Sequence, residues 1–169
     1  MSAPADKFLL WPDKRLKDVA APVDGVDDNV RAIWDRMLDM MYAMPGVGLA
    51  APQIGVGLRL AVLDCETTGR APVRLANPEV IELSPELSEH EEASPNLPGV
   101  WAKVRRPKWA LVAYVDERGF RTRRKFEGLW ATSVQHQIDH LDGKLFIDRL
   151  SPVKRKMVLD KFRKLQRKR

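Results

Sequence analysis

The sequence predicts an α+β fold with mostly antiparallel strands, and three observations support this. An amphipathic helical pattern runs from about Asp28 to Ala43, strand-like runs occupy much of residues 58–126, and a helical pattern returns from about Gly128. The turn signal at residues 116–119, Asp-Glu-Arg-Gly, joins two of the strands as a hairpin. No repeat, low-complexity block or linker divides the chain, so we predict a single domain over residues 1–169.

The composition is typical of a globular protein. A chain of 169 residues that is 44% hydrophobic and 31% charged can bury roughly 70% of the surface that its unfolded form exposes. The one cysteine, Cys65, excludes an internal disulfide and suits a reducing compartment. Residues Met1 to Lys7 lack the basic and apolar regions of a signal peptide, and no run approaches the ~18 apolar residues of a membrane span. We therefore expect a cytoplasmic protein without a membrane contact.

The first predicted helix, from about Asp28 to Ala43, has a clear apolar stripe. Its N-cap candidates are Asp27, Asp28 and Asn29. The apolar residues follow at helical spacing: Val30, Ile33, Trp34, Met37, Leu38 and Met41. This periodicity is typical of core packing rather than of a cofactor site.

The next segment, Pro45 to Gln53, is too rich in glycine for a helix and too apolar for an ordinary exposed loop. Its glycines would let the backbone come close to a ligand. The predicted strands then cover residues 58–63, 73–75 with 80–83, 102–105, 111–115 and 122–126.

The helical segment from about Gly128 contains two of the three histidines, His136 and His140. Residues four apart share one face of a helix, so both imidazoles can point at one ion, and Gly143 supplies a stop signal. This is the spacing of the H-x-x-x-H half of a metal site. In the H-E-x-x-H form of the motif, a glutamate beside the first histidine is the general base of a metallohydrolase. Here that position is Gln137, which cannot accept a proton near neutral pH.

The C-terminal segment carries the charge. Residues 151–169 contain nine Lys or Arg and one acid, which exceeds the net charge of +6 of the whole chain, so the rest is slightly acidic. Ser151 and Pro152 predict a helix start, as N-cap and first helical residue. An apolar stripe runs through the segment at Val153, Met157, Val158, Phe162 and Leu165. We therefore predict a basic C-terminal helix over residues 150–169.

Three segments together resemble the bacterial peptide deformylases, which remove the formyl group from the N-terminal formyl-methionine of nascent chains. Gly46 to Gln53 is similar to the first family motif, G-φ-G-L-A-A-x-Q, without a mismatch. Glu92 to Asn96 lies where the family has E-G-C-L-S, and Gln135 to Gly143 is similar to Q-H-E-x-D-H-L-x-G apart from one residue. The resemblance spans nearly the whole chain. It implies the deformylase fold, with antiparallel sheets around a central metal-motif helix and with N-terminal and C-terminal helices.

The departures from the family pattern fall where its chemistry lies. The family holds Fe(II), or Ni, Co or Zn, through a cysteine and two histidines, so the resemblance implies His136, His140 and Ser94 as the metal ligands here. A serine hydroxyl is a neutral, weak ligand compared with a thiolate. We therefore expect a divalent metal (Fe²⁺, Zn²⁺ or Ni²⁺) to be held weakly, with doubtful occupancy. Gln137 replaces the base, and such catalysis typically contributes ~10²–10⁴-fold.

The resemblance also implies a change in the oxyanion site. In the family, the backbone N–H after the cysteine and the glutamine of the first motif bind the developing oxyanion. Pro95 has no N–H, and losing one such donor costs on the order of 10²–10³ in rate, whereas Gln53 can still donate. Gln137, Gln53 and Pro95 are thus the catalytic positions. Because Ala93 and Asn96 also depart from the pattern, we favour natural divergence over laboratory inactivation, and we predict an inactive or strongly impaired deformylase homologue.

The substrate pocket is predicted beside His136, on the face of its helix. The predicted pocket residues are Val47, Gly48, Leu49, Leu129, Thr132 and Ser133. The two hydroxyls suggest a more polar wall than a methionine side chain would favour, unless their rotamers hide them. Glu92 and Arg105 are similar to family positions that support the site, and Asp139 is expected to pair rather than to catalyse. His90 is either a replacement ligand or, as we favour, an exposed loop histidine, and we place Cys65 away from the histidines.

Two functions remain open. The first is an inactive homologue that keeps a pocket for nascent N-termini and binds the ribosome through its basic tail. The second is a working metal-dependent deformylase, in which Ser94 and water complete the metal shell. The tail contacts ribosomal RNA or is a solvated helix packed on the domain, and we favour the first. The predicted ribosome-binding residues are Lys154, Arg155, Lys156, Lys161, Arg163 and Lys164. We expect a monomer and no DNA partner.

Overall fold

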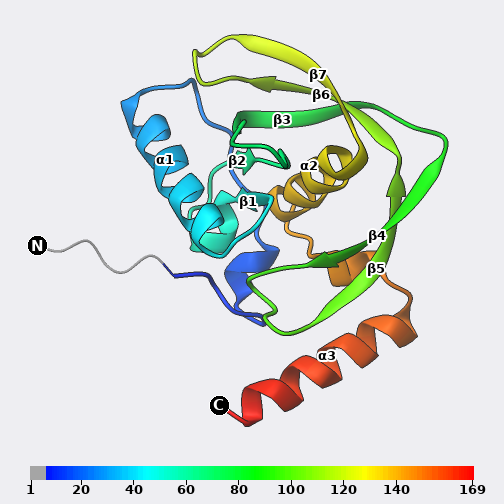
Figure 1. Ribbon diagram of the computed structural model, residues 1–169. Helices are drawn as coiled ribbons and strands as arrows, with labels where there is room; N and C mark the ends of the chain where they lie inside the picture. The colour runs from blue at the N-terminus through cyan, green and yellow to red at the C-terminus, as the bar shows by residue number, and fades with distance from the viewer. Residues whose placement is uncertain (1–6) are drawn as a thin grey trace, which may run out of the picture.

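A computed structural model describes residues 7–169 (Figure 1). The prediction about a signal peptide therefore lies outside the described residues, apart from Lys7. The elements are η1 (Lys14–Lys17), α1 (Asp28–Ala43), β1 (Gly48–Ala50), η2 (Ala51–Ile54), β2 (Leu60–Leu63), β3 (Val73–Leu83), β4 (Leu87–Ala93), β5 (Trp101–Pro107), β6 (Trp109–Val115), β7 (Arg121–Glu127), α2 (Gly128–Leu141), η3 (Phe146–Arg149) and α3 (Pro152–Arg167). No helix within this part of the chain is long and apolar enough to cross a membrane.

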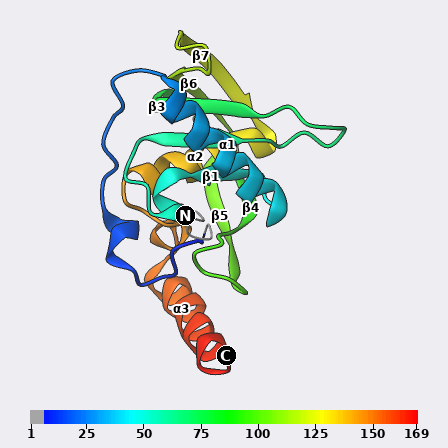
Figure 2. The ribbon, with the colours of Figure 1, turned by 90° about the vertical axis from the view of Figure 1, so that its left-hand side faces the viewer.

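The strands form two antiparallel sheets, as the sequence predicts. One sheet has the order β1-β2-β3-β6-β7, and β4 pairs with β5 as a separate hairpin. Helix α2 lies between the larger sheet and the hairpin, as Figure 1 and the rotated view in Figure 2 show. The metal-motif helix is therefore central, and residues 131–141 are all buried.

Helix α1 spans the predicted residues. Asp27 is the N-cap, and its carboxylate accepts a hydrogen bond from the backbone N–H of Val30 at 2.8 Å. The apolar stripe is buried against β1 and β2, and Trp34, Met37 and Met41 are fully enclosed. The prediction that this stripe is core is confirmed.

The sequence did not predict two of the strands, and two predicted strand segments form a single strand in the structure. Strand β1 has only three residues, and the less exposed positions of β4 (sequence LSEHEEA) are all polar, half-buried at Ser88 and His90 and buried at Glu92, so neither strand has an apolar period-2 signal. The two predicted segments at 73–75 and 80–83 are one strand, β3, with register shifts between its pairs to β6. Asn77 adopts a positive φ of 50° at the first of these shifts, between Ala76 and Glu79.

Helix α3 begins as predicted, with the Ser151 hydroxyl accepting from the Lys154 N–H at 3.3 Å. Its apolar stripe divides into two parts. Leu159 and Phe162 are buried in a cluster with η3 and the β5 side of the molecule, whereas Val153 and Met157 are exposed. Figure 2 shows α3 at the edge of the molecule, so one face of the helix packs and its basic face meets solvent.

Candidate active site

The two histidines of α2 converge as their spacing predicts. The Nε2 atoms of His136 and His140 are 3.1 Å apart, and their ring centroids are separated by 4.8 Å. Burial lowers the pKa of His140 well below its usual value, and the neighbouring His136 and Arg106 add to this effect. His140 is therefore a neutral imidazole whose ring nitrogen is available as a ligand.

A chain of buried charges fixes the orientation of His136. Its Nδ1 lies 2.8 Å from Glu92, whose two oxygens also accept from Arg106 at 2.6 and 2.9 Å. Arg106 donates to Asp139 at 2.9 Å, and Arg149 donates to both oxygens of Asp139. Burial alone would raise the pKa of Glu92, but the hydrogen bonds from His136 and Arg106 outweigh it and lower the pKa to about 2. The ionised Glu92 accepts from Nδ1 and so directs the lone pair of Nε2 into the site.

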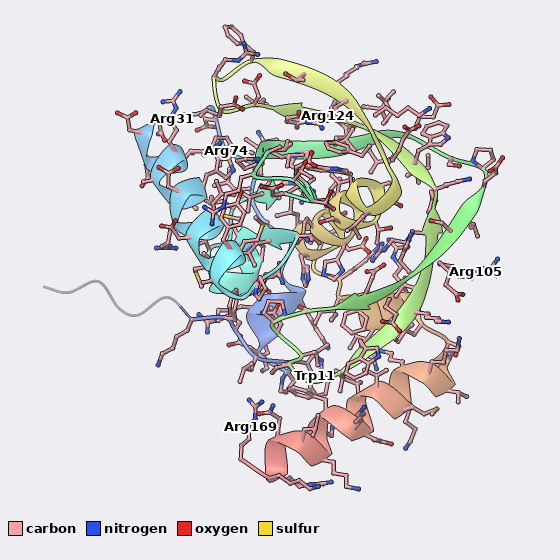
Figure 3. All side chains as sticks on the ribbon, viewed as in Figure 1. Trp11, Arg31, Arg74, Arg105, Arg124 and Arg169 are labelled. Carbon is pink, nitrogen blue, oxygen red and sulfur yellow. The ribbon has the colours of Figure 1, made fainter. Side chains whose placement is uncertain are left out.

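The arginine in this chain is Arg106, and the prediction that named Arg105 is wrong. Neighbouring residues of a strand point to opposite faces, so only one of the two can reach Glu92. Arg106 is 3% exposed, whereas Arg105 lies at the outer edge of the β4–β5 hairpin (Figure 3). Asp139 pairs as predicted.

Ser94 belongs to a buried polar network with Gln53 and Asn96. Its hydroxyl donates to the Asn96 side-chain oxygen at 3.0 Å and accepts from the Asn96 backbone N–H and from Gln53 Nε2, at 3.2 and 3.3 Å. Gln53 Nε2 also donates to Asn96 at 2.8 Å, while its Oε1 accepts from the Ala50 N–H. Both hydrogens of the Gln53 amide therefore have partners, of which the contact to Ser94 is the weaker. Asn96 is wholly buried and accepts hydrogen bonds from both Gln53 and Ser94, and the sequence did not predict this role.

The donor set fits a divalent ion held mainly by two imidazoles. Two nitrogens that each lie ~2.1 Å from a tetrahedral ion are roughly 3.4 Å apart, close to the separation of 3.1 Å between the Nε2 atoms of His136 and His140. The third predicted ligand, Ser94, is neutral and shares its lone pairs within the polar network. Over residues 7–169 no group of three or more His, Cys, Asp or Glu is arranged to hold a metal ion. A metal here thus has two good ligands and one weak one.

A cavity of about 490 Å³, the histidine pocket, opens beside these residues. Its walls include Gln53, Ser94, Pro95, His136 and Gln137 together with the predicted Val47, Gly48, Leu129, Thr132 and Ser133, as well as Met44 and Glu91. Leu49, also predicted, is not part of the wall. Side chains alternate along β1, so the residue after Gly48 points into the core under α1, where it is fully buried.

The pocket hydroxyls are satisfied by the protein. Ser133 donates to the Val47 carbonyl at 3.2 Å, and the Thr132 hydroxyl lies 3.1 Å from His90 Nδ1. The wall is therefore less polar than the sequence suggests. His90 is neither a metal ligand nor a loop residue, since it is half-buried on β4. Cys65 contacts the Val47 carbonyl, and burial raises the pKa of its thiol to about 12, so it is an inert thiol behind the wall.

Gln137 meets the backbone of β1 at Gly48. A Cβ at this glycine would lie 2.4 Å from the Ser133 hydroxyl and 2.5 Å from Gln137 Nε2, so no larger residue fits. The Oε1 of Gln137 is buried and has no hydrogen-bond partner among the described residues. A buried acceptor without a partner is costly, so this atom calls for a donor from a ligand or a water molecule.

Residues 5–156 match the family model described as polypeptide deformylase. The chain is 45% identical to the peptide deformylase of Methylocella silvestris over 166 residues, which are 95% of this chain and 85% of that protein. It is also 45% identical to the peptide deformylase of Rhizobium meliloti, over 93% of this chain and 91% of the relative.

The chain belongs to the polypeptide deformylase family. Its fold is that of the solved deformylases. A peptide deformylase from Legionella pneumophila has a TM-score of 0.87 and 42% identity, covering 96% of this chain and 98% of its own. The enzyme from Ehrlichia chaffeensis in complex with actinonin has a TM-score of 0.88 and 34% identity, covering 95% and 97%. The chain is thus a member of a metal-dependent hydrolase family.

The comparisons contradict the prediction of an inactive homologue. Relatives that share 45% of their residues with this chain over nearly its whole length are named as peptide deformylases, and they favour the alternative, a working deformylase with an altered site. The prediction rested on the loss of three separate roles at one site, the metal ligand at Ser94, the oxyanion donor at Pro95 and the base at Gln137. The rest of the site is intact in the structure, and residues that act as one unit do not contribute additively.

Proposed function

We propose that the protein is a metal-dependent peptide deformylase, which hydrolyses the formyl amide of N-formylmethionyl peptides. The observation that carries the proposal is the convergence of His136 and His140 at 3.1 Å, with His136 oriented by ionised Glu92, in a chain of the deformylase family. Hydrolytic metal sites commonly bind their ion through imidazole nitrogens, and a carboxylate often orients the ring of such a histidine.

His136, His140 and Ser94 would hold the metal, which supplies Lewis-acid polarisation of the scissile carbonyl. Fe²⁺, Zn²⁺ and Ni²⁺ all accept imidazole ligands, and the identity of the ion belongs to the proposal. Gln53 takes the oxyanion role: the substrate oxygen replaces Ser94 as acceptor for the weaker N–H bond of 3.3 Å. The second bond of Gln53, to Asn96 at 2.8 Å, keeps the amide in place.

Gln137 orients the reacting groups and does not accept a proton. Its Oε1 is buried in the wall of the histidine pocket and lacks a donor, so it can accept a hydrogen bond from the attacking water or from the substrate N–H. An amide orients these groups without removing a proton. We therefore expect a slow reaction in which orientation and electrostatics, rather than general-base catalysis, provide the rate enhancement.

The pocket suits an extended peptide with an apolar first side chain. Met44, Val47 and Leu129 supply apolar wall, and the hydroxyls of Thr132 and Ser133 already have partners. Strands β1 and β4 both line the cavity, and β1 is at the edge of its sheet while β4 belongs to a two-stranded hairpin. A peptide can therefore be held by backbone hydrogen bonds to a free strand edge.

The test is formate release from formyl-Met-Ala-Ser by protein purified in a buffer that protects Fe²⁺ from oxidation, read beside its metal content. We expect turnover that disappears with chelation and returns with added divalent metal. His140→Ala is the matched inactive control, since it removes one of the two strong ligands. Formate release no greater than that of His140→Ala, with metal present, would reject the proposal.

We also propose that α3 contacts ribosomal RNA, which places the protein in the cytoplasm where nascent chains emerge. Its exposed face carries five of the six predicted basic residues beside exposed Val153 and Met157, whereas Arg155 is half-buried and paired with Asp148. Phosphate contacts weaken steeply with salt, so co-sedimentation with ribosomes should be strong at low salt and lost at high salt. Equal pelleting after charge reversal at Lys154, Lys161 and Lys164 would rule this contact out.

A further inference from the structure

A second cavity, of about 270 Å³, lies against a different face of α2 from the histidine pocket. We call it the rear cavity. It is bounded by the end of β3, by β5, by α2 and by η3. Four of its lining residues are apolar, namely Val80, Leu83, Pro107 and Ile138. The volume is just below the roughly 300–1,000 Å³ of pockets for drug-sized ligands, so it suits a smaller molecule.

Three arginines line the rear cavity, and one of them has no acidic partner. Arg106 forms salt bridges with both Glu92 and Asp139. Arg149 uses Nε and Nη2 on Asp139, which leaves its Nη1 without a partner within residues 7–169. Arg105 makes no ion pair within the described chain.

The acids around the cavity leave one positive charge in excess. Asp139 accepts from two arginines, and Asp142 is paired with Arg59 at 2.9 Å. Glu89 lies opposite Arg105 in the β4–β5 register, and the structure gives no ion pair between them. The residues that line the cavity and their salt-bridge partners include four arginines (Arg59, Arg105, Arg106 and Arg149) and three acids (Glu92, Asp139 and Asp142). One negative charge restores the balance.

We propose that the rear cavity is a binding site for a small monocarboxylate with an apolar body, held by Arg105 and Arg149. Guanidinium groups bind carboxylates through paired, charge-assisted hydrogen bonds, and the apolar lining residues contact the rest of the molecule. The inference is independent of the proposed function.

The site is coupled to His136 by the buried charges already described. Arg149 contacts Asp139, which contacts Arg106, which contacts Glu92, which contacts His136, and each of these links has a hydrogen bond of 2.9 Å or less. A carboxylate that draws Arg149 toward itself therefore weakens the hold of this arginine on Asp139. Arg149 is exposed, and from Asp139 onward the change reaches the ring of His136 through buried groups, where charges interact strongly.

Calorimetric titration of the full chain tests the binding. The probes are hexanoate, for a free acid, and N-acetyl-leucine, for the C-terminal residue of a peptide. Hexanol and N-acetyl-leucinamide are their neutral counterparts, and inorganic phosphate is the competing anion. We expect saturable binding of at least one carboxylate. The carboxylate that binds more tightly shows whether the natural ligand is a free acid or the C-terminal residue of a peptide. Arg105→Gln should weaken the binding about 10-fold or more, while Arg123→Gln, on β7, should not change it.

Several results would overturn the binding site. They are no saturable heat at millimolar carboxylate, equal binding of the neutral counterparts, tighter binding of phosphate, and an unchanged affinity in Arg105→Gln.

The ring signals of the histidines test the coupling. Saturating carboxylate should shift the proton resonance of His136 in nuclear magnetic resonance spectra, while His90, which bonds to Thr132 outside the charge chain, should stay in place. Binding that leaves the His136 signal unmoved would overturn the coupling.

Discussion

The single residue that most limits the proposed chemistry is Gln137, because its amide occupies the place of a base. We predict that Gln137→Glu raises kcat/KM for formyl-Met-Ala-Ser by ~10²–10⁴-fold, the usual contribution of a general base. Glutamate has the same length as glutamine, so it can occupy the same position in the pocket wall, against Gly48. Formate release at saturating metal measures the change.

The control for added charge is Asn29→Asp, at an exposed position of α1. It should leave the rate unchanged. A Gln137→Glu protein that binds metal fully and gains less than about threefold in kcat/KM would show that deprotonation of water does not limit this enzyme.

Two neighbouring arginines should differ sharply in their effect on stability. Arg106→Gln removes the guanidinium that two buried carboxylates share, which leaves Asp139 with Arg149 alone and Glu92 with His136 alone, and we predict a loss of about 3–5 kcal/mol in the free energy of unfolding. Arg105→Gln, one residue earlier and exposed, should change it by no more than about 0.5 kcal/mol. Urea unfolding measures both. Equal losses would mean that the buried chain does not hold the hairpin against α2.

At the scale of elements, the sequence predicted those whose burial follows a simple period. Helix α1 was predicted to the residue, because an N-cap and an apolar stripe both define it. Strand β4 was missed, because it faces solvent on one side and a polar site on the other, so that one of its inward residues is the charged Glu92. The site shows the same division. The i, i+4 geometry of His136 and His140 follows from helix spacing. The choice between Arg105 and Arg106 depends on which residues of β5 point inward, and an error of one residue in the register of the strand exchanges the two faces.

The contact between β1 and α2 gives a prediction at this scale. Gly48→Ala places a methyl group within 2.5 Å of Ser133 and Gln137, and we expect it to push these side chains into the pocket and reduce kcat/KM at least about 10-fold. Gly57→Ala is the matched control, since a Cβ there meets nothing within 4 Å. Formate release and the unfolding midpoint are measured together. Activity of Gly48→Ala equal to that of Gly57→Ala would show that β1 and α2 can separate at no cost.

For the whole molecule, two interpretations remain predictions: that residues 1–169 form a single domain, and that the altered motifs arose by natural divergence. The buried charges, by contrast, set a property of the entire fold, its stability against pH. His140 is held neutral, with its pKa lowered by burial, and Glu92 and Asp139 are held ionised, with lowered pKa values. In the unfolded chain each of these groups binds a proton more readily, so acid favours unfolding.

The sign and the pH window follow from these shifts. His140 costs stability as the pH falls below its usual pKa of 6.5, because the unfolded imidazole gains a proton that the folded one refuses. Glu92 contributes stability above its usual pKa of 4.5 that is lost as the pH falls toward about 2. We therefore predict a free energy of unfolding, measured in urea with chelator present, that declines in two stages, each by up to about 1.4 kcal/mol per pH unit and group. His140→Gln should remove the first stage, Glu92→Gln should weaken the second even if it lowers stability overall, and Asp28→Asn, on the exposed end of α1, should alter neither. A profile that is flat from about pH 7 to about pH 4 would mean that water reaches His140 and that the centre is open rather than sealed.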